Sequence, residues 1–252
     1  MQEATVDPTL LRTGGLRISA YGLFLLAGLA LGLYRFVRTC HRAGLGRAEA
    51  LDLGLNLALV ALLGARAGYV LAHAGAYVQD PVRALWVWQD RGLAFYGGVA
   101  ACVLCCRLLR SDRWVQILDV LAAPAALGYT VGALGTLWVF VGRPTDLPWA
   151  VEVAGTLRHP VGAYLALASL AAYRLLEGRT GAAGSGQALL AYLVLQGTAR
   201  FAAEAFVDPV TTSAVAGPLT LGQLSAAVVA AAGAVGLWWG RRGAGEGGSQ
   251  PG

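Results

Sequence analysis

Residues 187–206 read QALLAYLVLQGTARFAAEAF, an almost wholly apolar stretch that carries two ionisable side chains, Arg200 and Glu204, four positions apart. At about 1.5 Å per residue, a helix of this length crosses the hydrocarbon core of a bilayer. An arginine near the middle of such a helix costs roughly 2.5 to 3.5 kcal/mol, so it is tolerated where it faces a protein interior or a wet cavity. The stretch therefore predicts a membrane helix that contributes a charged group to a buried polar site. The alternative is a helix-stabilising ion pair, which with arginine before glutamate is worth only a few tenths of a kcal/mol.

The composition indicates a membrane protein. The chain is 57% hydrophobic and 13% charged, with a mean hydropathy of +0.59, whereas soluble domains are about 45 to 50% apolar. We predict an all-α polytopic membrane protein with about seven transmembrane helices, near residues 18–37, 50–72, 93–109, 115–141, 161–176, 187–206 and 219–239. Residues 1–239 are expected to form a single membrane domain. The glycine-rich residues 240–252 are expected to form a disordered cytoplasmic tail.

The arginines predict the orientation, because all nineteen basic residues are arginine. Eleven follow the first, third, fifth and seventh predicted spans: Arg35, Arg38, Arg42, Arg47, Arg107, Arg110, Arg113, Arg174, Arg179, Arg241 and Arg242. Six lie on the other side: Arg12, Arg17, Arg83, Arg91, Arg143 and Arg158. The positive-inside rule then places the N-terminus outside and the C-terminus in the cytoplasm. The net charge of +5 is attributed to this topology and to anionic lipid, and no nucleic-acid partner is expected.

The third predicted span combines cysteines, glycines and aromatic residues. Cys102, Cys105 and Cys106 lie in an apolar helix without a paired Cys/His cluster, so we expect reduced, buried thiols and no metal. The span opens with Gly92 and the motif Tyr96-Gly97-Gly98, after an aromatic stretch that contains Tyr77, Trp86 and Trp88. These glycines either let a lipid headgroup approach the backbone or serve tight helix packing.

A loop with two prolines follows the fourth predicted span. Residues 142–149 read GRPTDLPW, and prolines prevent this segment from continuing as a helix. It is either a lid over a cavity mouth or an ordinary external turn. His159 and Pro160 then begin the fifth predicted span.

An ordered series of short motifs extends over nearly the whole chain. They are residues 21–23, 64–69, 92–98, Asp119 with Pro124 and Gly128, residues 142–149, His159-Pro160, and Arg200-Phe201 with Glu204. In content and order they resemble the prolipoprotein diacylglyceryl transferase family. The resemblance implies a seven-helix enzyme of the bacterial cytoplasmic (inner) membrane that works at the outer leaflet without a cofactor. Its reaction would transfer the diacylglyceryl group of phosphatidylglycerol to the lipobox cysteine of a preprolipoprotein. The expected partners are that lipid, the lipobox peptide and the surrounding membrane lipids.

Within that resemblance, Arg200 and Tyr96 are the expected catalytic residues. Substrate binding is expected from Tyr21, Arg66, Gly97, Gly98, Arg143, His159 and Glu204. The leaving phosphate gains negative charge as its bond to carbon breaks, so a guanidinium in a low-dielectric cavity favours the transition state. Arg200 is expected to provide it and Glu204 to hold it in position, while Arg66 or Arg143 would bind the phosphate through paired donors.

Two positions depart from the family pattern on the fourth span. Ala133 and Thr136 stand where the family signature has arginine and asparagine. This leaves open a second interpretation, in which the chain is a non-catalytic lipid- or lipoprotein-binding membrane homologue or carries altered transferase chemistry. A retinal protein is excluded because its Schiff base needs a lysine, and the chain has none. A transporter is disfavoured because the sequence shows no matched pair of broken half-helices.

Overall fold

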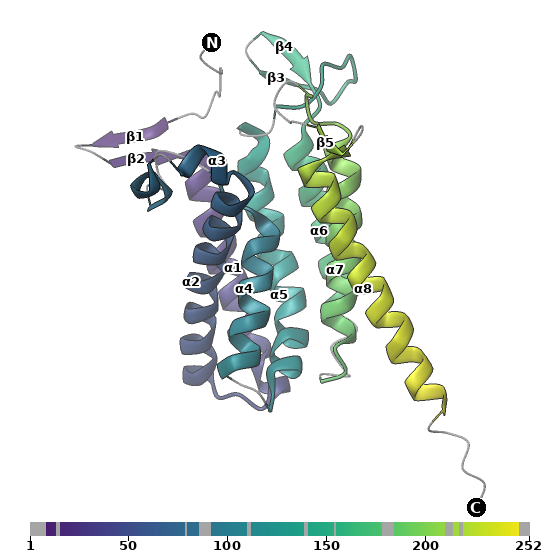
Figure 1. Ribbon diagram of the computed structural model, residues 1–252. Coiled ribbons are helices and arrows are strands. Elements are labelled where there is room, and N and C mark those ends of the chain that lie inside the picture. Colours follow the sequence, from purple (N-terminus) through teal and green to yellow (C-terminus); the bar gives the residue numbers. More distant parts are fainter. Residues whose placement is uncertain are drawn as a thin grey trace, which may run out of the picture.

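The computed structural model describes residues 9–13, 16–78, 80–85, 92–109, 112–138, 141–153, 155–177, 184–209, 214–216 and 219–246. In this part of the chain, seven helices of 15 residues or more form an elongated bundle (Figure 1). They are α1 (Ala20–Thr39), α2 (Arg47–Ala72), α4 (Phe95–Leu109), α5 (Trp114–Gly135), α6 (Val161–Glu177), α7 (Gln187–Glu204) and α8 (Leu221–Glu246). Each of them overlaps one of the predicted spans.

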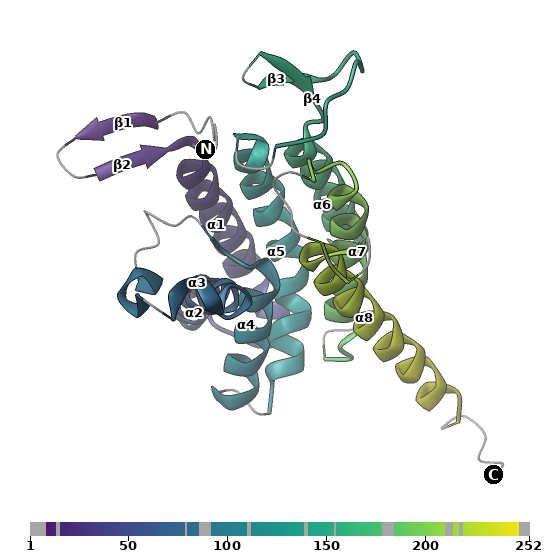
Figure 2. The same cartoon turned by 45° about the horizontal axis from the view of Figure 1, so that its top comes forward.

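Short elements complete the described chain. They are the helix α3 (Ala74–Tyr77), the 3-10 turns η1 (Cys40–Ala43), η2 (Pro81–Leu85) and η3 (Thr136–Trp138), and the strands β1 (Thr9–Thr13), β2 (Leu16–Ser19), β3 (Val151–Val153), β4 (Thr156–Arg158), β5 (Ala214–Ala216) and β6 (Leu219–Thr220). The strands form three antiparallel pairs, β1–β2, β3–β4 and β5–β6. All three pairs lie at one end of the bundle, called here the hairpin end (Figures 1 and 2). The all-α prediction is therefore right for the bundle and omits these pairs.

Within the described ranges, four segments are long and apolar enough to cross a membrane: Ala20–Ala43, Arg47–Ala72, Trp114–Gly135 and Leu221–Gly240. The helices α4, α6 and α7 are shorter, with 15, 17 and 18 residues. Their crossing of the membrane remains a prediction.

Two helix ends differ from the predicted spans. The fourth long helix ends at Gly135 and passes into the turn η3, short of the predicted boundary at residue 141. The last helix continues to Glu246, so residues 240–246 of the expected disordered tail are helical. The guanidinium carbon of Arg242 lies 3.8 Å from the ring centroid of Trp238, one turn earlier. This cation–π contact lies within the extension.

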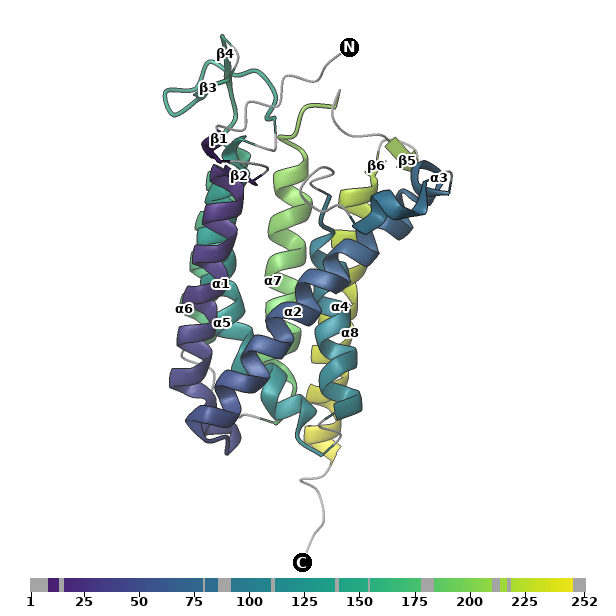
Figure 3. The same cartoon turned by 90° about the vertical axis from the view of Figure 1, so that its left-hand side faces the viewer.

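Helix α5 lies at the centre of the bundle, where it contacts α1, α4, α6 and α7. Glycines bring α1 and α5 together, since a Cβ atom on Gly128 would lie only 2.7 Å from the carbonyl oxygen of Gly28. Such small residues let membrane helices pack backbone against backbone. The helix pairs α2–α4 and α7–α8 flank this centre (Figure 1), and Figure 3 shows α2 running obliquely to α1.

The start of α7 is fixed by a carboxylate of α5. Asp119 is buried, and its Oδ2 accepts hydrogen bonds from the backbone N–H groups of Gly184 and Gly186, at 3.1 and 2.8 Å. Its Oδ1 accepts a third from Leu189 at 3.0 Å. Backbone N–H groups at a helix start need such acceptors. Asp119 therefore sets the position of the helix that carries Arg200.

The arginines remain unevenly distributed between the two ends of the bundle. The end opposite the hairpins holds the α1–α2 and α4–α5 connections and the C-terminal ends of α6 and α8 (Figure 1). Described arginines at this opposite end are Arg35, Arg38, Arg42, Arg47, Arg107, Arg113, Arg174 and Arg242. Arg91, Arg110, Arg179, Trp86 and Trp88 lie outside the described residues. Which end faces the cytoplasm is still a prediction.

Candidate functional site

Arg200 forms an ion pair with Glu204 inside the bundle. Their side chains are 21% and 6% exposed, and Arg200 Nε lies 3.5 Å from Glu204 Oε2. The other carboxylate oxygen, Oε1, accepts a hydrogen bond of 3.2 Å from Thr220 Oγ1 just before α8. A Cβ atom at Gly222 would lie 2.5 Å from the same oxygen, so this glycine leaves room for the carboxylate. One oxygen of Glu204 therefore contacts Thr220 and the other faces the Arg200 guanidinium.

Tyrosines from three other helices gather around this pair. Tyr129 of α5 lies close enough to interact with the Arg200 side chain. Tyr96 of α4 and Tyr21 of α1 lie close enough to interact electrostatically with the guanidinium. Among the described residues the buried Tyr96 hydroxyl has no hydrogen-bond partner. We call Arg200, Glu204, Tyr21, Tyr96 and Tyr129 the arginine cluster.

The arginine cluster unites four of the nine predicted site residues and adds one that the sequence prediction missed. Tyr21, Tyr96, Arg200 and Glu204 were expected, and Tyr129 was not. One signal for it was present, because Tyr129 precedes Ala133 by one helical turn and so lies on the same face as the signature position. Position 133 itself is 1% exposed and packs with Val161, Ala203 and Val207.

Gly97 and Gly98 pack against α2. Cβ atoms on them would lie 2.5 Å from the carbonyl oxygen of Gly64 and 2.7 Å from that of Ala61. Consecutive helical residues are about 100° apart, so this packing directs Tyr96 away from α2. The geometry favours the helix-packing interpretation of the two glycines, and their binding of substrate remains a prediction.

Arg66 is buried at the junction of α2 and α4. Its guanidinium donates to three backbone carbonyls, with Nε 2.7 Å from Ala84, Nη1 3.1 Å from Gly92 and Nη2 3.2 Å from Arg83. It also faces the rings of Tyr69 and Tyr77, at 5.8 and 5.6 Å from their centroids. Arg66 therefore holds the connection that leads into α4. Its predicted contact with phosphate is not among these interactions and is untested.

The loop after α5 is held along both edges at the hairpin end. On one edge, Asp208 N donates to Val141 O (2.9 Å) and Arg143 N to Phe206 O (2.8 Å). On the other edge, Thr145 N donates to Leu157 O and His159 N to Arg143 O, both at 3.0 Å. Residues 141–145 thus lie between the end of α7 and the segment before α6. Whether residues 142–149 act as a lid remains a prediction.

Side chains reinforce this arrangement. Arg158 Nη1 lies 2.7 Å from Asp208 Oδ2 and also donates to Gly142 O at 3.0 Å. Arg143 Nε donates to Val207 O at 3.2 Å. Because Val207 lies three residues after Glu204, this bond connects the predicted phosphate ligand to the segment just after α7. His159 Nδ1 lies 3.0 Å from the Tyr164 hydroxyl. Arg143 and His159 therefore belong to the hairpin end, where Arg143 contacts the backbone just after α7 and the His159 N–H donates to Arg143 O.

No group of three or more His, Cys, Asp or Glu residues is arranged to hold a metal ion in the part of the chain that the structure describes. The arginine cluster instead offers a largely buried cation, a carboxylate beside it and a hydroxyl that has no partner among the described residues. These groups suit an anionic oxygen ligand, because charge-assisted hydrogen bonds to a guanidinium are strong where water is scarce.

Comparison with known proteins shows similarity over most of the chain. A family model described as prolipoprotein diacylglyceryl transferase matches residues 8–239. The phosphatidylglycerol–prolipoprotein diacylglyceryl transferase of Cupriavidus necator is 34% identical over 271 residues, with 97% of each chain covered. That of Bordetella parapertussis is 32% identical over 83% of this chain and 85% of its own. That of Geobacter sulfurreducens is 28% identical over 89% and 91%.

Proposed function

This chain belongs to the prolipoprotein diacylglyceryl transferase family, and we propose that it transfers the diacylglyceryl group of phosphatidylglycerol to the lipobox cysteine of preprolipoproteins. The thiol loses its proton, because the thiolate is the nucleophile, and in the balanced reaction this proton ends on the released glycerol phosphate. The thiolate sulfur then bonds to the glyceryl carbon that carries the phosphate. The carbon–oxygen bond breaks, its electron pair stays on the phosphate oxygen, and glycerol phosphate leaves.

The arginine cluster carries this proposal. A buried guanidinium placed where phosphate charge develops stabilises the transition state more than the ground state. Removing one such donor typically costs about 10²- to 10³-fold in rate. Arg200 takes this role, and Glu204, itself held by Thr220, keeps the guanidinium in place.

The free hydroxyl of Tyr96 supplies a second donor. Because it is buried without a partner among the described residues, a substrate oxygen there removes an unsatisfied polar group. Tyr96 donates to the phosphate that Arg200 neutralises, and Tyr21 and Tyr129 line the same space. Arg66, Gly97 and Gly98 hold α4 against α2, and their effect on lipid binding follows from the position of α4.

The hairpin end receives the peptide substrate. Arg143 and His159 lie beside the end of α7, on the side from which a lipobox cysteine would reach Arg200. Exposed Trp149 and Leu157 accompany them, and aromatic residues are enriched at membrane interfaces. The signal peptide of a preprolipoprotein would lie against this surface.

All seven long helices cross the bacterial cytoplasmic membrane, with the N-terminus outside and the C-terminus in the cytoplasm. One membrane domain covers residues 1–239. The hairpin end then faces the outer leaflet, where the arginine cluster meets phosphatidylglycerol. The arginine-rich opposite end supports this orientation.

Complementation tests the function. Cells depleted of their own transferase, expressing this chain, are scored for lipidation of a reporter lipoprotein. We expect rescue by the wild type and by Arg174→Gln, an exposed arginine on α6. Arg200→Lys, which keeps the charge but loses the planar donor fork, should fail. A well-inserted wild-type protein without rescue would favour the non-catalytic lipid- or lipoprotein-binding alternative.

A further inference from the structure

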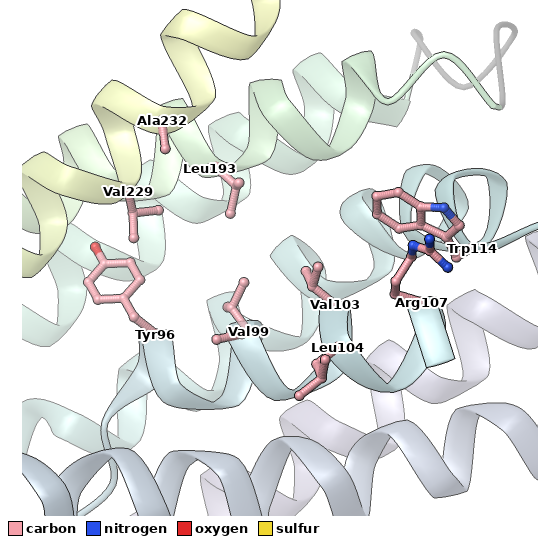
Figure 4. A pocket seen from close by; sticks show the side chains of 10 residues that line it. Tyr96, Val99, Val103, Leu104, Arg107, Trp114, Leu193, Val229 and Ala232 are labelled. Carbon is pink, nitrogen blue, oxygen red and sulfur yellow. The ribbon is translucent and has the colours of Figure 1, made fainter. Parts of the chain in front are cut away.

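An apolar groove runs along α4 on the side that faces α7 and α8. Its volume is about 500 Å³, and Val99, Val103, Leu193 and Val229 contribute to its walls. Figure 4 shows Tyr96 at one end and Arg107 beside Trp114 at the other. The volume lies within the range of about 300 to 1,000 Å³ that small-molecule sites occupy. In a membrane, an apolar groove of this size suits the acyl chain of a lipid.

The groove is long enough for an acyl chain. Eleven residues separate Tyr96 from Arg107, which corresponds to about 16 Å along a helix. The hydrocarbon tail of a lipid occupies one leaflet, about 15 Å of a core of about 30 Å. One acyl chain whose headgroup lies at Arg107 would therefore fill the groove.

The charge at the Arg107 end determines which way the lipid points. Among the described residues, none forms an ion pair with Arg107, whereas the nearby Arg113 has Asp112 at 3.6 Å. A substrate lipid with its phosphate at Arg200 would place its chain end beside the Arg107 guanidinium, which is unfavourable for both groups. A lipid of the opposite leaflet places an anionic headgroup there. Trp114 suits that position, because indole rings prefer the headgroup level.

We propose that this groove is a second lipid site, which holds an acyl chain of an anionic phospholipid whose headgroup lies at Arg107. This lipid comes from the leaflet opposite the proposed reaction and is not the diacylglyceryl donor. It covers the apolar gap between α4 and α8 up to Tyr96. The inference uses the proposed function only for the membrane placement of the bundle and for the identity of Arg200 as the donor-lipid ligand.

The test counts lipids that stay bound to the purified full-length chain. Native mass spectrometry follows a titration with phosphatidylglycerol in a neutral detergent, and phosphatidylcholine serves as the probe without net charge. All variants carry Arg200→Gln, which removes the cation proposed to hold the donor lipid. Each double variant carries one further substitution, which is Arg107→Gln, the groove-filling Ala100→Trp, or the control Arg174→Gln. Arg174 is an exposed arginine at the same end of the bundle, and it is absent from the groove lining.

We expect the Arg200→Gln parent to retain one phosphatidylglycerol more tightly than phosphatidylcholine. Arg107→Gln should weaken that binding about fivefold, the effect of one arginine near an anionic headgroup. Ala100→Trp should abolish it, and Arg174→Gln should leave it unchanged. The proposal is overturned if the parent retains no lipid, if both lipids bind equally, or if Arg107→Gln and Arg174→Gln behave alike. Transfer activity is measured separately, so a failure of the proposed function leaves these outcomes intact.

Discussion

Glu204 Oε2 lies 3.5 Å from Arg200 Nε while Glu204 Oε1 accepts a hydrogen bond from Thr220, so one carboxylate connects the central arginine to the start of α8. The ion pair with Glu204 is the contact that orients the guanidinium, and Tyr129 lies near enough to interact with it. An arginine with a fixed orientation presents its donors to a developing charge without reorganising, which is the basis of electrostatic catalysis. We therefore predict that the pair contributes to transfer in addition to stabilising the helix.

Glu204→Gln should reduce transfer while leaving the folded protein intact. The amide keeps the shape of the side chain and loses the charge that holds Arg200. A hydrogen bond to a charged group contributes about 1.5 to 3 kcal/mol, so we expect a loss of about 10- to 100-fold in kcat. Thr220→Ser retains the hydroxyl and serves as the control. Lipidation of a reporter peptide by the purified variants measures both, and an unchanged rate for Glu204→Gln would contradict the role.

Tyr96→Phe should separate activity from stability. It deletes only the buried hydroxyl that has no partner among the described residues, so thermal stability in detergent should be unchanged or slightly higher. The rate of transfer should fall about 10-fold or more if this hydroxyl donates to the phosphate. Tyr34→Phe, at an exposed position on α1, should change neither quantity. A variant at position 96 with full activity would remove the hydroxyl from the mechanism.

The sequence predicts the long helices of this fold better than the strand pairs and connections at the hairpin end. Hydropathy locates the long helices because a helix that crosses the hydrocarbon core of a bilayer needs a long run of apolar residues. The strand pairs and the backbone ladder of residues 141–145 were missed, because Arg143 and Phe206 pair across a long stretch of chain and no local pattern records such pairing. Arg200 and Glu204 were predictable because charges stand out in an apolar helix. Tyr129 did not stand out, since aromatic residues are common in membrane helices.

Ala133→Arg should not restore a missing site. Ala133 is 1% exposed and packs against Ala203 and Val207 of the α7 region. The hydroxyl of Thr136 already donates to the Ala133 carbonyl oxygen at 2.7 Å. A long cation there overfills the core and costs about 1 to 3 kcal/mol or more. We expect less folded protein on size-exclusion chromatography and no gain in transfer. A well-folded and faster variant would show that the site has room for the family arginine.

Gly128→Val should prevent the contact between α1 and α5, because a Cβ atom there would lie 2.7 Å from the Gly28 carbonyl oxygen. Gly132→Ala is the matched control on the same helix, where a Cβ atom would meet nothing within 4 Å. We expect a loss of about 1 to 3 kcal/mol for the valine variant and none for the alanine variant. Heating series followed by size-exclusion chromatography measure the difference, and equal stability of the two would refute the packing model.

The ion pair between Arg158 and Asp208 gives the sharpest test of the hairpin end, because its two charges can be exchanged. Both side chains are largely buried, at 21% and 15% exposure, and Arg158 also donates to Gly142 O. Asp208→Arg should lower the free energy of unfolding by about 1 to 3 kcal/mol or more, since it leaves Arg158 facing a second cation. Arg158→Asp alone should cost at least as much, through repulsion between two carboxylates. The double variant with exchanged charges should recover part of the loss, although the bond to Gly142 is gone. Thermal unfolding of the four proteins forms a double-mutant cycle. A coupling energy near zero would mean that the backbone ladder alone holds residues 141–145 against the end of α7.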